Sequence, residues 1–378
     1  MCLVDRPRWW GGGGKKRKKR RARRALASGL GIFDCWRVTF YRLLRPLFFL
    51  LPPEVAHHLA LAGLSAAWRA GFLGKPPPGQ PAEVMGLRFP NRVGLAAGMD
   101  KNARHVGAWG GLGFGFVEVG TVTPRPQPGN AGPRLFRLPA AQALINRMGF
   151  NNDGAAAAAA RLAGRAAFPL VGVNIGKNAT TPKEKAADDF RAAMREVYRV
   201  ADYIAVNVSS PNTAGLRDLQ AASALDALLG SLCAEREKLA SEQGRLVPLA
   251  VKLSPDLGEH ESEEAARCIS DHPIAAVIAT NTTTDRLAVA GLPHAAESGG
   301  LSGLPLREVS TRMVGRLRGL LPARMAIIGV GGIFCAEDAR EKVRVGADLV
   351  QVYTGLVYRG PGLVRELAEG LAECGVSR

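Results

Sequence analysis

Short apolar runs recur along the chain, and each is followed by a stretch long enough for a helix. Eight runs have the length and β-branched content of strands buried on both faces. They lie at residues 93–97, 116–121, 170–176, 203–208, 249–253, 276–280, 326–330 and 349–353. Eight strand-then-helix units are the number that closes a parallel barrel. The pattern therefore predicts an α/β protein with a (β/α)8, or TIM, barrel.

Polar residues and glycines gather at the C-terminal ends of these runs. They occupy positions 98–102, 120–121, 174–178, 207–213, 280–282, 331–332 and 353–355. A single Asn or Ser at such a point most often forms a turn. A bias toward one end of every strand instead favours an active site at the mouth of a barrel over the single ligand crevice of a doubly wound sheet.

Two helical patterns precede the barrel. Residues 36–51 combine leucines and aromatic residues with arginines, are interrupted by Pro46 and end at Pro52, and a second pattern begins at Glu54. The uncharged apolar stretch at 46–53 is far shorter than the roughly 20 residues that cross a bilayer. The pair suits helices in a membrane interface, helices packed on the barrel, or both at once.

Three segments are therefore expected. Residues 1–34 form a basic, glycine-rich and disordered tail, residues 35–75 a helical pair, and residues 76–378 the barrel. The formal net charge is +17, and the tail supplies about half of it. The tail suits anionic lipid, non-specific nucleic acid, a mitochondrial presequence or no function at all. Because the excess charge is confined to it, we expect no specific nucleic-acid partner.

The six cysteines are scattered singly along the chain. No C-x-x-C motif is present, and we identify no histidine at metal-binding spacing from a cysteine. Reduced cysteines and no metal site are expected.

The last two strand ends indicate a phosphate site. Gly331 and Gly332 precede a helical pattern from Ala336, and residues 353–355 end the neighbouring strand. Glycine amides and a helix N-terminus favour anions, and barrels often hold phosphate after strands seven and eight. No G-x-G-x-x-G motif follows the first strand, so a dinucleotide is not expected. A phosphorylated cofactor such as FMN is favoured.

Two lysines and a set of amides complete the expected site. Lys252 ends an apolar strand, where it would stabilise a reduced flavin or form a salt bridge on the barrel rim. Lys101 would contact the cofactor, a substrate carboxylate or a rim acid. Converging amides can bind a flat ring that carries alternating carbonyl and N–H groups. The amides are Asn146, Asn174, Asn207, Asn212 and Asn281.

Residues 98–102, 146–152, 176–178, 209–213, 280–282 and 330–332 resemble those of the dihydroorotate dehydrogenases, and the resemblance extends from about residue 52 to the C-terminus. The N-terminal helical pair, and a serine where the soluble class carries cysteine, point to class 2, the quinone-linked and membrane-associated form. The resemblance implies oxidation of (S)-dihydroorotate to orotate, the fourth step of pyrimidine (UMP) biosynthesis. It also implies one FMN per chain and ubiquinone or menaquinone as acceptor. A peripheral location on the cytoplasmic face of the cell membrane is expected, with the mitochondrial inner membrane as the alternative.

The resemblance also implies residue roles. Ser210 would be the base that removes the C5 proton while hydride leaves C6 for the flavin. The substrate would contact Lys101, Asn146, Arg147, Met148, Gly149, Phe150, Asn207, Asn212, Asn281 and Thr282. FMN would contact Ala97, Gly98, Met99, Asp100, Lys101, Thr121, Asn174, Asn207, Lys252, Thr280, Gly303, Gly332, Tyr353 and Thr354.

A serine is a weak base and needs a proton relay, which the sequence does not reveal. Strand alternation places Asn207 and Ser209 on one side, so Ser210 must reach the substrate from a loop, and Ser209 is the alternative base. Ala214 stands where the family commonly has proline, and the first 30 residues match nothing in the family pattern. The nearest alternative function is a barrel flavoenzyme that reduces fumarate or NAD.

Overall fold

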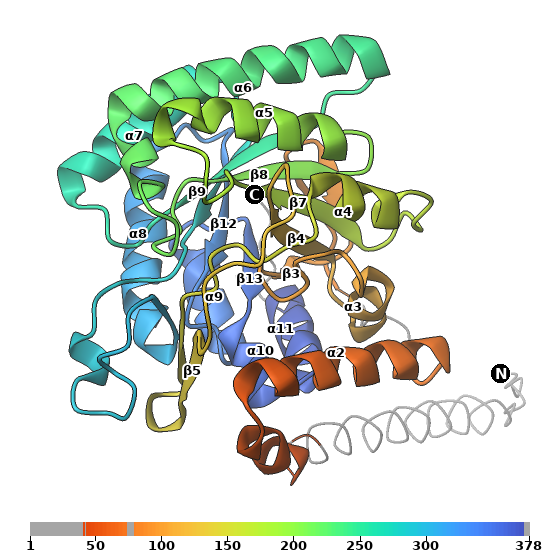
Figure 1. The fold of residues 1–378 in the computed structure, drawn as a ribbon. Helices are drawn as coiled ribbons and strands as arrows, with labels where there is room; N and C mark the ends of the chain where they lie inside the picture. The colour runs from red at the N-terminus through yellow and green to blue at the C-terminus, as the bar shows by residue number, and fades with distance from the viewer. Residues whose placement is uncertain (1–40, 42, 74–78, 374–378) are drawn as a thin grey trace, which may run out of the picture.

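The computed structural model describes residues 41, 43–73 and 79–373. The predicted tail at 1–34 lies outside these residues. Figure 1 shows a central barrel with helices around it and an N-terminal helical segment along one side.

Eight parallel strands close the predicted barrel. They are β3 (Val93–Leu95), β4 (Phe116–Val122), β7 (Leu170–Ile175), β8 (Tyr203–Asn207), β9 (Leu249–Leu253), β10 (Ala276–Ala279), β12 (Ala326–Val330) and β13 (Leu349–Val352). The last strand pairs with the first, with Val350 opposite Val93. All eight fall within or close to the predicted runs, which confirms the strand assignment and the fold class.

Large and small side chains alternate inside the barrel. A Cβ added to Gly172 would lie 2.0 Å from the Tyr203 ring, and one added to Gly94 would lie 2.2 Å from the Phe116 ring. The glycines therefore make room for aromatic rings on neighbouring strands. A hairpin of β1 (Ala82–Val84) and β2 (Leu87–Phe89) packs against this interior cluster. The sequence analysis did not predict it.

Helices of the barrel units cover its outside (Figure 1). They are α3 (Val106–Leu112), α4 (Ala155–Leu162), α5 (Ala186–Val197), α6 (Ala222–Gln243), α7 (Glu259–Asp271), α8 (Arg307–Leu320), α9 (Ala336–Arg344), α10 (Thr354–Arg359) and α11 (Gly362–Ala372). Their apolar faces and the outward faces of the strands form the main hydrophobic core.

A three-stranded antiparallel sheet, which was not predicted, lies apart from the barrel strands. It consists of β5 (Leu135–Leu138), β6 (Ala143–Asn146) and β11 (Gly300–Gly303), in the order β11, β6, β5. Its ends carry predicted site residues, because Asn146 is the last residue of β6 and Gly303 the last of β11. This sheet therefore adds one wall to the barrel mouth.

The N-terminal unit consists of the helical residues 43–50 and of α2 (Pro53–Arg69). Helix α2 packs on β5 of this sheet and on α3. Residues 43–50 are helical through Pro46, which was predicted to interrupt the helix. A proline removes only its own N–H donor, and at the first position of α2 proline is favoured.

Two arginines hold the N-terminal unit in place. Arg134 binds both carboxylate oxygens of Glu54 at 3.0 to 3.2 Å. Arg137 donates to the carbonyls of Phe49 and Leu51 at 3.2 and 2.8 Å. Among the described residues, no helix is long and apolar enough to cross a membrane.

Candidate active site

A polar pocket opens at the C-terminal ends of the barrel strands. Counting its mouth, it encloses about 1010 Å³. Nineteen of the predicted site residues line it: Ala97, Gly98, Lys101, Thr121, Asn146, Met148, Gly149, Phe150, Asn207, Ser210, Asn212, Lys252, Thr280, Asn281, Thr282, Gly303, Gly332, Tyr353 and Thr354.

Four predicted site residues do not line this pocket. Met99 faces a second, apolar pocket. The buried Asp100 accepts hydrogen bonds from two backbone N–H groups of the following turn at 2.9 and 2.8 Å. Arg147 forms an ion pair with Glu297 at 2.6 Å, and Asn174 is fully buried beneath the pocket. These four residues lie outside the pocket lining, and their contacts with a ligand stay predictions.

Five asparagines were predicted to converge on one pocket, and four of them line it as two hydrogen-bonded pairs, whereas Asn174 lies outside the lining. Asn281 donates through Nδ2 to Oδ1 of Asn207 at 3.2 Å, and Asn207 donates through Nδ2 to Oγ1 of Thr121 at 2.9 Å. Across the pocket, Asn212 donates to Oδ1 of Asn146 at 3.3 Å. The pocket therefore presents several amide groups at fixed orientations.

Ser209 and Ser210 have different surroundings. The Ser209 hydroxyl is fully buried, donates to Oδ1 of Asn207 at 3.3 Å and accepts from Nδ2 of Asn281 at 3.0 Å. Ser210 lines the pocket, and its Oγ accepts the backbone N–H of Asn212 at 3.3 Å. Ser210 lies beyond the end of β8, in the loop that sequence alternation required.

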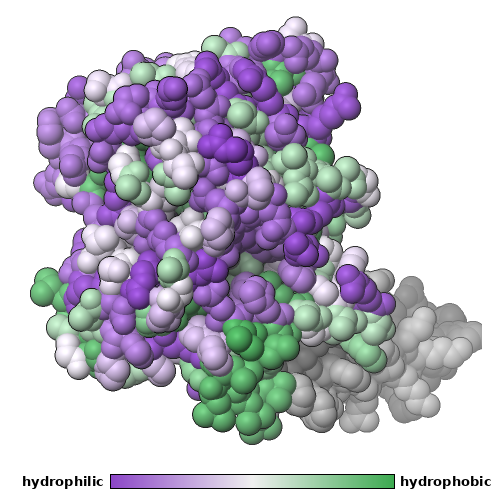
Figure 2. Space-filling model, in the orientation of Figure 1, coloured by the Kyte–Doolittle hydropathy of each residue, from purple (hydrophilic) through white to green (hydrophobic). Residues whose placement is uncertain are grey.

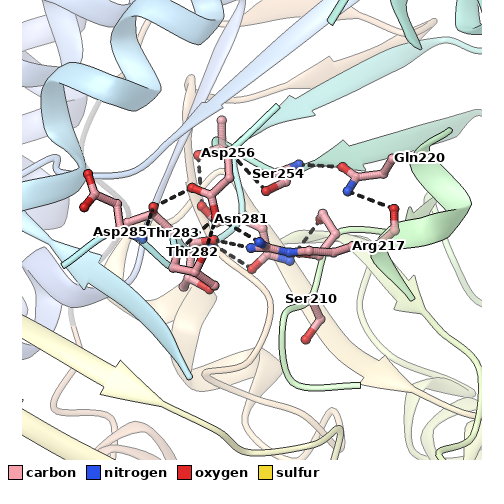
Figure 3. A network of polar contacts seen from close by, with 12 residues as sticks. Ser210, Arg217, Gln220, Ser254, Asp256, Asn281, Thr282, Thr283 and Asp285 are labelled. Carbon is pink, nitrogen blue, oxygen red and sulfur yellow. Dashed lines mark hydrogen bonds and ion pairs between the residues drawn. The ribbon is translucent and has the colours of Figure 1, made fainter. Parts of the chain in front are cut away.

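Arg217 ties this serine loop to the loop after β10 (Figure 3). It donates to the carbonyl of Ser209 at 3.2 Å, to that of Thr282 at 3.0 Å and to Oδ2 of Asp256 at 2.8 Å. Burial acts to raise the pKa of Asp256, but hydrogen bonds from Thr283 and its neighbour, together with Arg217, lower it. The ionised carboxylate therefore holds Arg217 across both loops.

Lys101 places a titratable cation in the pocket wall. Its Nζ donates to the carbonyl of Gly98 at 2.9 Å. Burial lowers the pKa of Lys101 to about 8; nearby Glu54 opposes this shift and Arg134 adds to it. At neutral pH most molecules keep the charge, so the pocket can bind an anionic group at this point.

Lys252 combines the two interpretations that the sequence left open. Its side chain lines the pocket, and its Nζ lies 3.7 Å from Oε1 of Glu118, which is also buried. A salt bridge is present, but inside the barrel and not on its rim. Lys252 can therefore face a ligand while its charge is compensated from below.

The predicted phosphate site needs one correction. Helix α9 begins at Ala336, as expected, but the amides at its start already have acceptors. Those of Phe334 and Cys335 donate to Asp338 at 2.8 and 3.1 Å, and that of Ala336 donates to Glu366 at 3.2 Å. Carboxylates of the chain thus occupy the place that the sequence assigned to a phosphate. The glycines of the preceding loop still line the pocket.

A second, mostly apolar pocket lies between the N-terminal unit and the barrel. Its walls come from Tyr41, residues 44–49, α2, α3, α10 and α11. Tyr353 lines both this pocket and the polar one. Burial raises the pKa of Tyr353 to about 12, and burial together with Lys101 lowers the pKa of His57, in the apolar wall, to about 3. Both side chains are therefore neutral near pH 7.

Residues 81–374 match the family model described as dihydroorotate dehydrogenase. The chain belongs to the dihydroorotate dehydrogenase family. This confirms the resemblance drawn from the polar strand ends.

Similar members of the dihydroorotate dehydrogenase family come from bacteria. A protein from Thiobacillus denitrificans named dihydroorotate dehydrogenase (quinone) is 55% identical, over 88% of this chain and 99% of the relative. A protein of the same name from Ralstonia nicotianae is 54% identical, over 88% and 98%. Crystal structures of DHODH from Eimeria tenella, ligand-free and with ferulenol, are 38% identical, each with a TM-score of 0.78. They cover 86% and 85% of this chain, and 97% and 91% of the Eimeria chains.

Several residues of the polar pocket were missed from the sequence. Ser302 lines the pocket and shares a hydrogen bond with Thr354 at 2.8 Å. Gln351 also lines it, and Glu118 lies buried beneath it. The available signal was a polar residue inside an apolar strand, as in the segments at 116–122 and 349–352.

One side-chain group departs from the expectation about metals. Cys268 and His272 are four residues apart, and together with Asp226 they place ligand atoms within 4.8 Å of one another. His272 already pairs with Asp226 at 2.9 Å, and burial raises the pKa of the Cys268 thiol to about 11. The statement that no histidine lies at metal spacing from a cysteine was therefore wrong.

Proposed function

We propose that this chain oxidises dihydroorotate to orotate in pyrimidine biosynthesis and passes the electrons to a quinone. The names of the bacterial relatives support the reaction. The observation that carries the proposal is Tyr353, because it forms part of a polar pocket on one side and of an apolar pocket on the other. A hydrophilic donor and a lipophilic acceptor can thus approach one place from opposite directions.

The polar pocket fits FMN as the group between them. Gly332 has φ +68°, and a Cβ on it would lie 2.3 Å from Cα of Arg307; a Cβ on Gly355 would lie 2.0 Å from the carbonyl of Ile333. Only backbone can occupy this wall, which leaves amides free to approach a phosphate. Oε1 of Gln351 is buried without a hydrogen-bond partner among the described residues. When bound, the flavin supplies the redox chemistry that couples a two-electron donor to a quinone.

Side chains of the pocket fit the substrate. Lys101 would bind its carboxylate, and the asparagine pairs would hold the amide groups of its ring. Ser210 would remove the C5 proton, because its hydroxyl lines the pocket whereas that of Ser209 has partners within the wall. Thr213 Oγ1 is buried and without a hydrogen-bond partner among the described residues, so it is a candidate acceptor in the relay that Ser210 needs.

The apolar pocket fits the tail and ring of ubiquinone or menaquinone. An exposed apolar surface adjoins it: Figure 2 shows the hydrophobic residues gathered at the lower edge of the molecule, over the N-terminal helical segment. Leu43, Leu47 and Leu50 are 70, 61 and 82% exposed. A surface of this kind suits peripheral contact with the cytoplasmic face of the cell membrane.

A substitution at the pocket wall tests the quinone route. Ala60 is an exposed residue of α2 that lines the apolar pocket, so Ala60→Trp would fill it at little cost to the fold. We expect the rate of quinone reduction to fall at least about tenfold. Reduction of a small water-soluble dye by dihydroorotate should be retained.

Val55→Trp is the matched control, because Val55 is an exposed α2 residue outside the apolar pocket lining. It should leave both rates near those of the unaltered protein. Equal quinone rates in the two variants would contradict the assignment of the apolar pocket. Reduction of NAD or fumarate in place of quinone would favour the alternative flavoenzyme.

A further inference from the structure

A glutamate lies in the interior of the barrel, directly beneath the polar pocket. Glu118 on β4 is 0% exposed. Its Oε1 accepts a hydrogen bond from Nδ2 of Asn174 at 2.8 Å and lies 3.7 Å from Nζ of Lys252. Its Oε2 accepts from the Tyr203 hydroxyl at 3.0 Å and from Nε2 of Gln351 at 2.7 Å. Four other strands thus direct donors at one carboxylate.

This arrangement fixes the direction of a hydrogen-bond chain. Tyr203 and Gln351 also donate to Glu118, and Asn174 turns its NH₂ group toward the same carboxyl group. Its Oδ1 then accepts from the Thr121 hydroxyl at 2.5 Å. Because the Thr121 hydroxyl donates its proton to Asn174, its oxygen accepts from Nδ2 of Asn207 at 2.9 Å. Oδ1 of Asn207 then accepts from Nδ2 of Asn281 at 3.2 Å. Each amide along the chain has one allowed orientation.

Glu118 also compensates the charge of Lys252. Two buried charges are tolerated when they are paired and hydrogen-bonded, whereas a single one is strongly disfavoured. Lys252 lines the polar pocket, so its positive charge acts on whatever binds there. The strength of that charge depends on the carboxylate 3.7 Å away.

We propose that Glu118 is a positioning residue for the flavin and the substrate, although it lines neither pocket. It fixes which group donates and which accepts at each hydrogen bond of the chain from Asn174 to Asn281. It also moderates the positive potential that Lys252 exerts on the flavin. The inference rests on the proposed function, because it assigns these effects to FMN in the polar pocket.

The test is the midpoint potential of bound FMN in the holoenzyme, measured for Glu118→Gln. Loss of the carboxylate leaves the charge of Lys252 uncompensated, which favours the reduced, anionic flavin. The potential should therefore become more positive. Because Gln can donate as well as accept, the amide chain loses its fixed direction, and the dissociation constant of FMN should rise at least about tenfold.

Tyr203→Phe is the matched control. It removes the hydrogen bond to Glu118 and the one that Tyr203 accepts from Gln351 at 3.3 Å, and it changes neither a charge nor the amide chain. Its potential should equal that of the unaltered protein, even if its melting temperature falls. The inference is overturned if Glu118→Gln leaves potential and FMN affinity unchanged, or if Tyr203→Phe shifts the potential equally.

A double variant keeps the test decisive if Glu118→Gln fails to fold. Lys252→Met alone should make the potential more negative. Adding Glu118→Gln removes the opposite charge, so the pair should return toward the original value. If Lys252→Met and the double variant have the same midpoint potential, the carboxylate has no influence on the flavin and the inference fails. If the unaltered protein binds no FMN at all, the proposed function is contradicted instead.

Discussion

Ser210 and Ser209 show how neighbouring residues of one type acquire different functions. Both are buried, and both follow the same strand. The Ser209 hydroxyl is engaged by Asn207 and Asn281, so it stiffens the amide cluster. Ser210 lines the pocket, while Arg217 holds the loop from outside (Figure 3). A weak base thus gains a fixed position, which general base catalysis requires.

Substitution of the two serines separates these roles. Ser210→Ala should keep bound FMN but lower the rate of flavin reduction by dihydroorotate by about 100-fold or more, the usual contribution of a general base. Ser209→Ala should act mainly on substrate binding, because it disturbs Asn207 and Asn281. Stopped-flow absorbance of the flavin measures both. An unchanged rate in Ser210→Ala would assign the base elsewhere.

Lys101 predicts a pH dependence. Its pKa is lowered to about 8, and only the protonated form attracts the substrate carboxylate. The dissociation constant of orotate should be nearly constant below this pH and rise by roughly tenfold per pH unit above it. Titrations from pH 6 to 9.5 would show the change. Lys101→Met should bind weakly at every pH, and a flat profile in the unaltered protein would exclude this role.

The sequence identifies many of the pocket residues because they follow the ends of predicted strands. Ser209 and Ser210 could not be distinguished in this way, since the difference lies in the partners of each hydroxyl. Glu118 and Gln351 were hidden within apolar runs, where strand pattern alone predicts core. Their function depends on which strands face them across the barrel.

At the scale of elements, the N-terminal helical segment has two distinct faces. Leu44, Phe48 and Phe49 line the apolar pocket. Leu47 and Leu50 are exposed and do not line it. The segment therefore packs on the protein with one side and presents leucines outward with the other. The sequence analysis allowed this combination of packing on the barrel and contact with a membrane.

The outward leucines should bind membranes. Each buried leucine contributes about 1.5 to 3 kcal/mol, so Leu47→Ser with Leu50→Ser should weaken binding to anionic vesicles by roughly 100-fold or more. Vesicle co-sedimentation measures this. Reduction of a soluble dye should not change, because neither residue lines a pocket. Leu246→Ser is the control, since Leu246 is 63% exposed and lies between α6 and β9. Equal loss in the control would contradict the assignment.

Strands and helices of the barrel units were predictable because an apolar run followed by a stretch long enough for a helix repeats eight times along the chain. The sheet of β5, β6 and β11 was not, although it places Asn146 and Gly303 at the pocket. Its strands have four residues each, and β11 joins the sheet only through β6, whose paired residues lie more than 150 positions earlier in the chain. Short runs without a local partner give no periodicity to detect.

For the whole molecule, two pockets of opposite polarity meet at Tyr353. The barrel supplies the polar one, and the docking of the N-terminal unit creates the apolar one. This division separates a hydrophilic donor from a lipophilic acceptor while keeping both close to the proposed flavin. It agrees with the exposed apolar edge that the N-terminal helical segment carries (Figure 2).

The most direct test is an absorbance titration of the purified protein under anaerobic conditions. We predict a flavin spectrum that is bleached by dihydroorotate at about one equivalent per chain and restored by a quinone. A colourless protein that cannot be reconstituted with FMN would contradict the account, and so would a flavin that dihydroorotate leaves oxidised.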